Sequence, residues 1–223
     1  MSAAKVFVLG ASRGIGLEYV RQYREAGAKV VATARKDEDL ARLRELGATA
    51  LKLDVGEAAS VSSLAWQIDG WAFDVVVINA GVNSRSNGLE PPTESDFDWV
   101  MRTNVLGPMR VIPQLTDALA PGARLAVISS RMGSIGARTA PNDWLYRASK
   151  AAVNSVLKDV SLALEGRAVC VSFHPGWVRT DMGGSGADID VKTSVAGMRS
   201  VLASVKPEHN GGYFNYDGQK LPW

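Results

Sequence analysis

The sequence is poor in the residues that mark extracellular or metal-binding proteins. Cysteine occurs once, at Cys170, so no disulfide can form within the chain, as is typical of a reducing compartment. Cys170 lies in the apolar run 168–171, which favours a buried structural thiol over a reactive one. The two histidines, His174 and His209, are far apart in sequence and have no supporting ligands nearby. We therefore expect no metal site.

The chain also lacks a strong charge of either sign and any long apolar run. It has 25 basic and 23 acidic residues, for a net charge of +2, and the basic residues are scattered. This balance argues against a nucleic-acid partner or an anionic membrane surface. No apolar run approaches the roughly 18 residues of a membrane span, and the first residues do not have the layout of a signal peptide. These absences predict a cytoplasmic protein with neither a membrane nor a nucleic-acid partner.

Short apolar runs alternate with amphipathic segments along most of the 223 residues. This alternation predicts a single α/β domain over 1–223, a Rossmann-type doubly wound parallel sheet of about seven strands with helices on both faces. A polar, Gly-rich segment at 181–190 is expected to be mobile. The expected strands are 6–9, 29–33, 50–53, 75–78, 124–128, 169–173 and 213–215. The expected helices are 14–26, 37–46, 57–68, one beginning after the Thr93 cap, 104–119 with a disturbance at Gly107 and Pro108, 144–165 and 191–205.

A glycine-rich turn follows the first predicted strand and opens the first helix. Its spacing is G-x-x-x-G-x-G rather than the commoner G-x-G-x-x-G. Such a turn lets the backbone approach a pyrophosphate, which the helix N-terminus then stabilises. Plain turn chemistry is the alternative, but the βαβ context makes it the weaker one. The cofactor-binding residues predicted here are Gly10, Ser12, Arg13, Gly14, Ile15 and Gly16.

The end of the second predicted strand indicates which dinucleotide binds. NAD sites carry an acidic residue there for the ribose 2′-hydroxyl, whereas an arginine accommodates a 2′-phosphate. This strand runs into Arg35 and Lys36, and Arg13 adds a second guanidinium from the glycine turn. Paired hydrogen bonds from guanidinium groups suit a phosphate dianion. The pattern therefore favours NADP(H) over NAD(H), unless Arg35 and Lys36 only solvate the start of the next helix.

Tyr146 and Lys150 lie four residues apart in a predicted helix. This spacing places a phenol and an ammonium on one helical face, about 5–6 Å apart at their Cβ atoms. A nearby cation is expected to lower the tyrosine pKa from about 10 toward the working range of a general acid. The pair alone is a weak signal, but it gains weight from the glycine turn.

Together these two motifs resemble the short-chain dehydrogenase/reductase family over essentially the whole chain. The resemblance identifies Asn104, Ser130, Tyr146 and Lys150 as the catalytic residues, with Asn104 holding Lys150 through a water. One departure is Ile78, where the family commonly has an asparagine before its Asn-Ala-Gly motif. The resemblance adds as cofactor-binding residues Asp54 and Val55 near the adenine, Asn79, Ala80 and Gly81 after the fourth strand, Tyr146 and Lys150 themselves, and Pro175, Gly176, Val178 and Thr180 near the nicotinamide.

The segments 130–136, 174–177 and 217–223 narrow the resemblance to the branch of C-factor-like proteins and small carbonyl reductases. Two serines compete for the catalytic position. Ser130 directly precedes the Arg-Met-Gly turn, whereas Ser134 would give a serine–tyrosine separation nearer the usual family value. Ser129 should point to the opposite face of its strand.

The resemblance implies an NADPH-dependent oxidoreductase that reduces a ketone, aldehyde or quinone, with Tyr146 as the general acid. The alternatives are an NADP(H)-binding redox sensor or signalling protein with little turnover, and an NAD-dependent alcohol dehydrogenase. The family also suggests a homo-oligomer formed through helices at 95–119 and 144–165, either a dimer or a tetramer. Candidate residues for the substrate walls are Arg85, Met132, Trp144, Trp177 and Met182, although Trp144 and Trp177 could equally be loop anchors.

Overall fold

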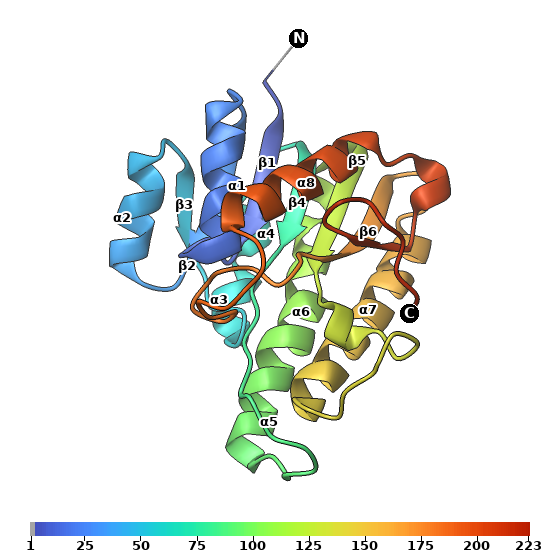
Figure 1. Ribbon diagram of the computed structural model, residues 1–223. Helices are drawn as coiled ribbons and strands as arrows, with labels where there is room; N and C mark the ends of the chain where they lie inside the picture. The colour runs from blue at the N-terminus through green and yellow to red at the C-terminus, as the bar shows by residue number, and fades with distance from the viewer. Residues whose placement is uncertain (1–2) are drawn as a thin grey trace.

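The computed structural model describes residues 3–223 and contains a seven-stranded sheet in the order β3-β2-β1-β4-β5-β6-β7 (Figure 1). Every strand pairs in parallel with its neighbours. The predicted fold class, a doubly wound parallel sheet, is therefore confirmed. The strands are β1 (Lys5–Leu9), β2 (Lys29–Ala34), β3 (Thr49–Lys52), β4 (Phe73–Ile78), β5 (Leu119–Ile128), β6 (Ala168–His174) and β7 (Gly212–Asn215).

Helices cover both faces of this sheet (Figure 1). Side chains alternate along each strand, so Val6 and Val8 enter one apolar core while Phe7 and Leu9 enter the other. The first core takes its helical side chains from α1, α2 and α8, and the second from α3, α4, α6 and α7. The helices are α1 (Gly14–Glu25), α2 (Asp37–Glu45), α3 (Ala58–Ser62), α4 (Leu64–Gln67), α5 (Glu94–Met101), α6 (Gly107–Leu115), α7 (Trp144–Ala163) and α8 (Val191–Ser204).

Three predicted elements differ from the structure. The helix expected at 57–68 is divided into α3 and α4 at Ser63, where serine hydroxyls bond locally. The helix expected at 104–119 instead begins as a π-helix over Arg102–Leu106 and continues as α6. Helix α6 ends at Leu115, and a 3-10 turn follows at Thr116–Ala118. Leu119 begins β5, and the register of β4 and β5 shifts between Phe73 and Val75. The sequence predicted that this strand begins only at residue 124, because Pro121 and Gly122 interrupt the apolar run.

The segment expected to be mobile, 181–190, is tied back to the loop that follows β6. The main chains of Trp177 and Arg179 both bond to Ile189, at 3.2 and 2.9 Å. Its mobility stays a prediction.

Strand order reverses between β1 and β4, which lie side by side although β2 and β3 separate them in sequence. The loops after β1 and β4 therefore diverge at the carboxyl edge, where doubly wound sheets bind their ligands. Among residues 3–223, no helix has the length and hydrophobicity to cross a membrane.

Candidate active site

A groove of about 760 Å³ runs along the carboxyl edge of the sheet. It is lined from the glycine turn, the ends of β2 and β4, the start of α7 and the loop after β6. Most of the predicted cofactor-binding residues line it: Gly10, Ser12, Arg13, Gly14, Ile15, Arg35, Asp54, Val55, Asn79, Ala80, Gly81, Tyr146, Lys150, Pro175 and Thr180. Five predicted site residues lie outside its wall: Gly16, Asn104, Ser130, Gly176 and Val178.

The glycine turn is packed tightly against the end of β4. A Cβ atom on Gly16 would lie 2.2 Å from the Gly10 carbonyl oxygen and 2.6 Å from Asn79 Nδ2. Gly10 has a φ of +78°, and a Cβ there would lie 2.8 Å from Ala80 Cα. Asn79 Nδ2 donates to the Gly10 carbonyl oxygen at 2.7 Å. Asn79 and Gly16 thus hold the shape of the turn from behind, and the groove side stays open.

One end of the groove is rich in cations. Arg13 pairs with Asp181 at 2.7 Å and Arg35 with Asp54 at 3.7 Å. Both arginine side chains are exposed, so these pairs contribute about 0–1 kcal/mol and either carboxylate can be exchanged for another anion.

Arg42 is a groove residue that the sequence analysis missed. It projects from α2, donates from Nη1 to the Ser12 carbonyl oxygen at 3.0 Å and lines the groove beside Lys36. The charged helix after β2 was visible in the sequence, but local pattern does not say which face of α2 turns toward the glycine turn. Further lining residues outside the prediction include Thr33, Glu38, Asp39, Val82, Thr103, Ser129 and Arg179.

Tyr146 and Lys150 are brought together at the other end of the groove. Lys150 Nζ lies 5.6 Å from the centroid of the Tyr146 ring and donates to the Ile128 carbonyl oxygen at 2.9 Å. Lys150 Nζ would be 3.2 Å from a Cβ atom on Gly81, so a larger residue there would crowd the ammonium. Both side chains are buried at the base of the groove, which favours proton transfer away from bulk water.

The electrostatics of this pair differ from the sequence-based expectation. Burial raises the pKa of Tyr146 to about 12, while the neighbouring Ser130 hydroxyl lowers it and Asp143 raises it further. Burial also lowers the pKa of Lys150 to about 8. The pKa of Tyr146 is therefore shifted upward rather than downward, because loss of water around the phenolate is the largest cause of the shift and the Lys150 ammonium bonds to the Ile128 carbonyl oxygen.

Asn104 connects the loop after β4 to α7 from within the π-helix. Its side chain accepts from the Val82 N–H and donates to the Val82 carbonyl oxygen, both at 2.8 Å. It also donates to the Ser149 hydroxyl at 3.0 Å, and that hydroxyl donates to the Tyr146 carbonyl oxygen. A π-helix is rare and often marks a functional site. Here it aims Asn104 between the two segments that carry Gly81 and Tyr146.

The three candidate serines have different surroundings. The Ser130 hydroxyl accepts from the Met132 N–H at 3.2 Å and lies beside the Tyr146 phenol. The Ser129 hydroxyl donates to the Lys150 carbonyl oxygen at 3.4 Å. Ser134 is fully buried, with its hydroxyl 2.6 Å from the Pro222 carbonyl oxygen. Of these three, Ser130 is the one whose hydroxyl adjoins the phenol.

The loop after β6 folds over the glycine turn. A Cβ atom on Gly14 would lie 3.3 Å from Thr180 Cγ2. Thr180 Oγ1 accepts from the Gly183 N–H at 3.1 Å, and Val178 is buried beneath. The predicted nicotinamide-side residues therefore stand opposite the turn, with Pro175 and Thr180 facing the groove and Gly176 and Val178 supporting the loop.

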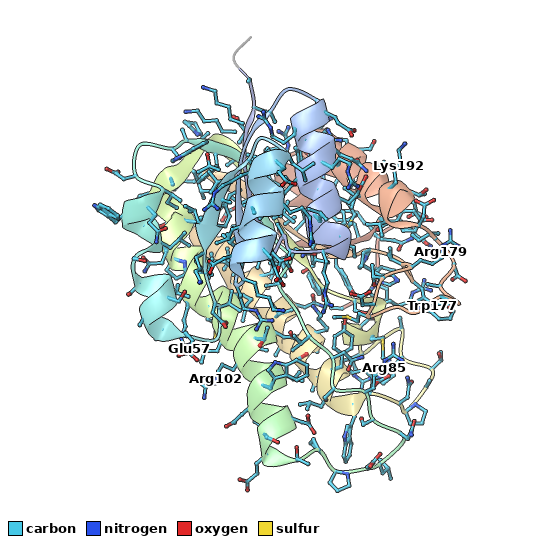
Figure 2. All side chains as sticks on the ribbon, turned by 90° about the vertical axis from the view of Figure 1, so that its left-hand side faces the viewer. Glu57, Arg85, Arg102, Trp177, Arg179 and Lys192 are labelled. Carbon is cyan, nitrogen blue, oxygen red and sulfur yellow. The ribbon has the colours of Figure 1, made fainter. Side chains whose placement is uncertain are left out.

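The mouth on the substrate side combines apolar and cationic groups. Arg85, Trp177 and Arg179 lie toward the same edge of the molecule in Figure 2. Arg85, with a φ of +29°, donates to the Met182 carbonyl oxygen at 2.6 Å and so joins the loops after β4 and β6. Trp177 is 53% exposed and Met182 42%. Trp177 donates to the Gly183 carbonyl oxygen at 2.9 Å, which anchors it to its own loop.

The buried ammonium predicts a pH-dependent contribution to stability. Because the folded-state pKa of Lys150 lies below its unfolded value of about 10.4, the unfolded chain binds more protons between about pH 8 and 10. As the pH rises from about 8 to 10, the free energy of unfolding of wild type, measured in urea, should therefore increase by about 3 kcal/mol relative to that of Lys150→Met. The contribution of Cys170 is common to both proteins and cancels. A constant difference between the two proteins would contradict the lowered pKa.

No cluster of three or more His, Cys, Asp or Glu side chains suited to a metal ion occurs within residues 3–223.

Comparisons with known proteins agree with this geometry. The family model described as short chain dehydrogenase matches residues 4–188. The C-signal protein of Myxococcus xanthus is 40% identical over 153 residues, covering 67% of this chain and 92% of the relative. The NADPH-bound carbonyl reductase from chicken fatty liver superposes with a TM-score of 0.87 at 29% identity, covering 100% of both chains. A carbonyl reductase of Pseudomonas aeruginosa PAO1 in complex with NADP also has a TM-score of 0.87, at 28% identity and 100% coverage of both chains.

Proposed function

We propose that this chain, which belongs to the short chain dehydrogenase family, is an NADPH-dependent oxidoreductase that reduces the carbonyl group of a ketone, aldehyde or quinone. One observation carries the proposal. A single groove has a cation-rich end formed by Arg13, Arg35 and Arg42 and a buried Tyr146–Lys150 pair at its other end. We propose that residues 1–223 act as one NADP-binding domain.

The residues present fit NADP(H). The glycine turn at the start of α1 offers main-chain N–H groups for a pyrophosphate. Arg13 and Arg35, which pair with the carboxylates of Asp181 and Asp54, are the residues that we propose for the 2′-phosphate. The NADP and NADPH found in the structural neighbours support the same cofactor. Asp54 and Val55 would lie along the adenine, and Pro175 and Thr180 along the nicotinamide.

The bound cofactor would supply the hydride, and the chain would supply the geometry and the proton. Ser130 would hold the substrate oxygen by hydrogen bonding as negative charge develops there. Tyr146 would donate its phenolic proton to that oxygen. Lys150 would stabilise the resulting phenolate with its positive charge and hydrogen-bond the nicotinamide ribose. Asn104 would hold Lys150 through a water, in addition to clamping the Val82 backbone.

We propose further that the protein is cytoplasmic and a homo-oligomer. The single cysteine, buried and without a disulfide partner in residues 3–223, supports a reducing compartment. Large apolar side chains remain exposed on the helices expected to form the interface, and exposed apolar surface often marks such contacts. These are Phe97 and Trp99 on α5, Met109 on α6 and Leu162 on α7.

The test is the loss of NADPH absorbance across a panel of ketones, aldehydes and quinones, with NADH in parallel. We expect turnover with NADPH and at least one carbonyl of the panel, apolar carbonyls first because the mouth exposes Trp177 and Met182. Tight binding of NADPH without turnover of any panel member would argue against the reductase. A clear preference for NADH would overturn the role of the cation-rich end.

Arg35→Ala tests the cofactor assignment. It should raise the KM for NADPH about tenfold to thirtyfold and leave the KM for NADH nearly unchanged, because one charge-assisted bond to the 2′-phosphate is lost. Arg44→Ala, on the helix α2 that follows Arg35 but outside the groove wall, is the matched control. An equal rise for both cofactors would mean that Arg35 only supports the fold of the groove.

A second candidate function rests on the similarity to C-signal. In this alternative the chain binds NADP(H) and acts as a signal or redox sensor with little turnover. The two functions differ in what Tyr146→Phe does: a sensor should keep its activity as long as the cofactor binds, whereas a reductase should lose turnover.

A further inference from the structure

The C-terminal segment reaches the site from behind. After β7, the chain turns at Gly218 and runs back along the strand, with Leu221 N–H donating to the Tyr213 carbonyl oxygen at 2.9 Å. Figure 1 shows this red segment ending near the loop that follows β5. The segment therefore contacts the loop that begins with Ser130.

Tyr213 contacts the proposed catalytic serine directly. Its phenol, in a side chain only 2% exposed, donates to the Ser130 carbonyl oxygen. The Ser129 and Asn154 side chains also adjoin this phenol. Since the carbonyl and the hydroxyl belong to the same residue, a restraint on one limits where the other can point.

Trp223 holds the far end of the same loop. Its main-chain oxygen accepts from the Ile135 N–H at 2.7 Å and from the Gly136 N–H at 3.3 Å, and it lies 3.0 Å from the Ser134 hydroxyl. The indole stacks on the Tyr213 ring, with 5.1 Å between ring centroids and 18° between the planes. Tyr213 and Trp223 thus act on the loop as one unit.

Between these two restraints, the loop is pressed against the catalytic helix. A Cβ atom on Gly133 would lie 2.7 Å from the main-chain carbon of Lys150. The Ser130 hydroxyl caps the 3-10 turn Arg131–Gly133 by accepting from Met132 N–H. The position of Ser130 relative to Tyr146 and Lys150 therefore depends on how the loop is held at both ends.

We propose that Tyr213 and Trp223 are positioning residues that hold the Ser130 hydroxyl in place for the reacting carbonyl oxygen. This inference rests on the proposed function, and specifically on the role of Ser130. Positioning matters because a displacement of about 1 Å can cost roughly 100-fold in rate. The tryptophan ring acts through Tyr213, and its main chain through residues 134–136.

Tyr213→Phe is the primary test. It removes the donor to Ser130 but keeps an aromatic ring for Trp223 to stack on. We expect kcat to fall about tenfold and the Tm to fall by about 2–4 °C through the lost hydrogen bond, with the Kd for NADPH nearly unchanged. The matched control is Tyr19→Phe, because the buried Tyr19 hydroxyl has no hydrogen-bond partner among residues 3–223. Its kcat should stay at the wild-type value.

A double-mutant cycle separates positioning from a merely structural role. In a Ser130→Ala background, assayed in single turnovers, Tyr213→Phe should have no further effect on the rate, because the group that it positions is gone. The same loss in both backgrounds would overturn the proposal. Trp223→Ala should lower kcat and Trp223→Phe should restore most of it. Equal losses in these two variants would contradict the role of the stacked ring.

Hydrogen exchange tests the restraint without depending on turnover. In the NADPH-bound protein, Tyr213→Phe should speed amide exchange at 131–136 while α1 stays protected. Unchanged exchange would overturn the proposed restraint, even if no carbonyl is reduced. A wild type that is inactive with every carbonyl would instead count against the proposed function. If Tyr213→Phe speeds exchange in a protein that reduces no carbonyl, Tyr213 restrains the loop at 131–136 but the proposed catalytic role of Ser130 is wrong.

Discussion

Tyr146→Phe is expected to lower kcat for carbonyl reduction by about 1,000-fold, within the range of roughly 100- to 10,000-fold that general acids contribute. The phenol is the acid of the proposed reaction, and its pKa of about 12 keeps the proton on it at neutral pH. Phenylalanine retains the ring that packs under Lys150 but has no proton to give.

The measurement is steady-state turnover with the best carbonyl found, together with NADPH titration by fluorescence. The Kd for NADPH should change less than threefold, because a factor of three is well below 1 kcal/mol. Tyr19→Phe is again the matched control, a buried phenol away from the groove. Retention of more than about a tenth of the wild-type kcat would mean that another group donates the proton.

Ser130→Ala is expected to lower kcat by about 100- to 1,000-fold, the usual cost of removing one donor to a developing oxyanion. The structure brings this hydroxyl beside the Tyr146 phenol. The Ser134 hydroxyl faces the Pro222 and Trp223 main-chain oxygens instead.

Ser134→Ala is therefore the informative comparison. It should cost about 1 kcal/mol of stability through the lost hydrogen bond and leave kcat within a few-fold of wild type. Kinetics and thermal unfolding of the two alanine variants, measured side by side, distinguish the serines. A larger kcat loss in Ser134→Ala than in Ser130→Ala would reverse the assignment.

The placement of the site at the strand ends could be predicted, but several of its contacts could not. The glycine turn and Arg35 were predicted from their positions after strands, Tyr146 from its spacing to Lys150, and Asn79 from the family resemblance. Arg42 was missed because the contact that matters crosses from α2 to Ser12. The restraint of Ser130 by Tyr213 joins residues 83 positions apart, which no local pattern encodes.

The sequence by itself determined the order of the strands and, within one residue, where each strand ends. Apolar periodicity and turn glycines act over a few residues, so Val6 to Leu9 and Gly10 to Gly16 already specify a strand followed by a nucleotide-binding turn. Only the tertiary structure decided the electrostatics. Whether Lys150 lowers the pKa of Tyr146 depends on how much water each group loses and on the Ile128 carbonyl that the ammonium meets. Both the burial and this hydrogen bond arise when α7 packs against β5. They shift the pKa of Tyr146 upward, whereas the spacing alone predicted a downward shift.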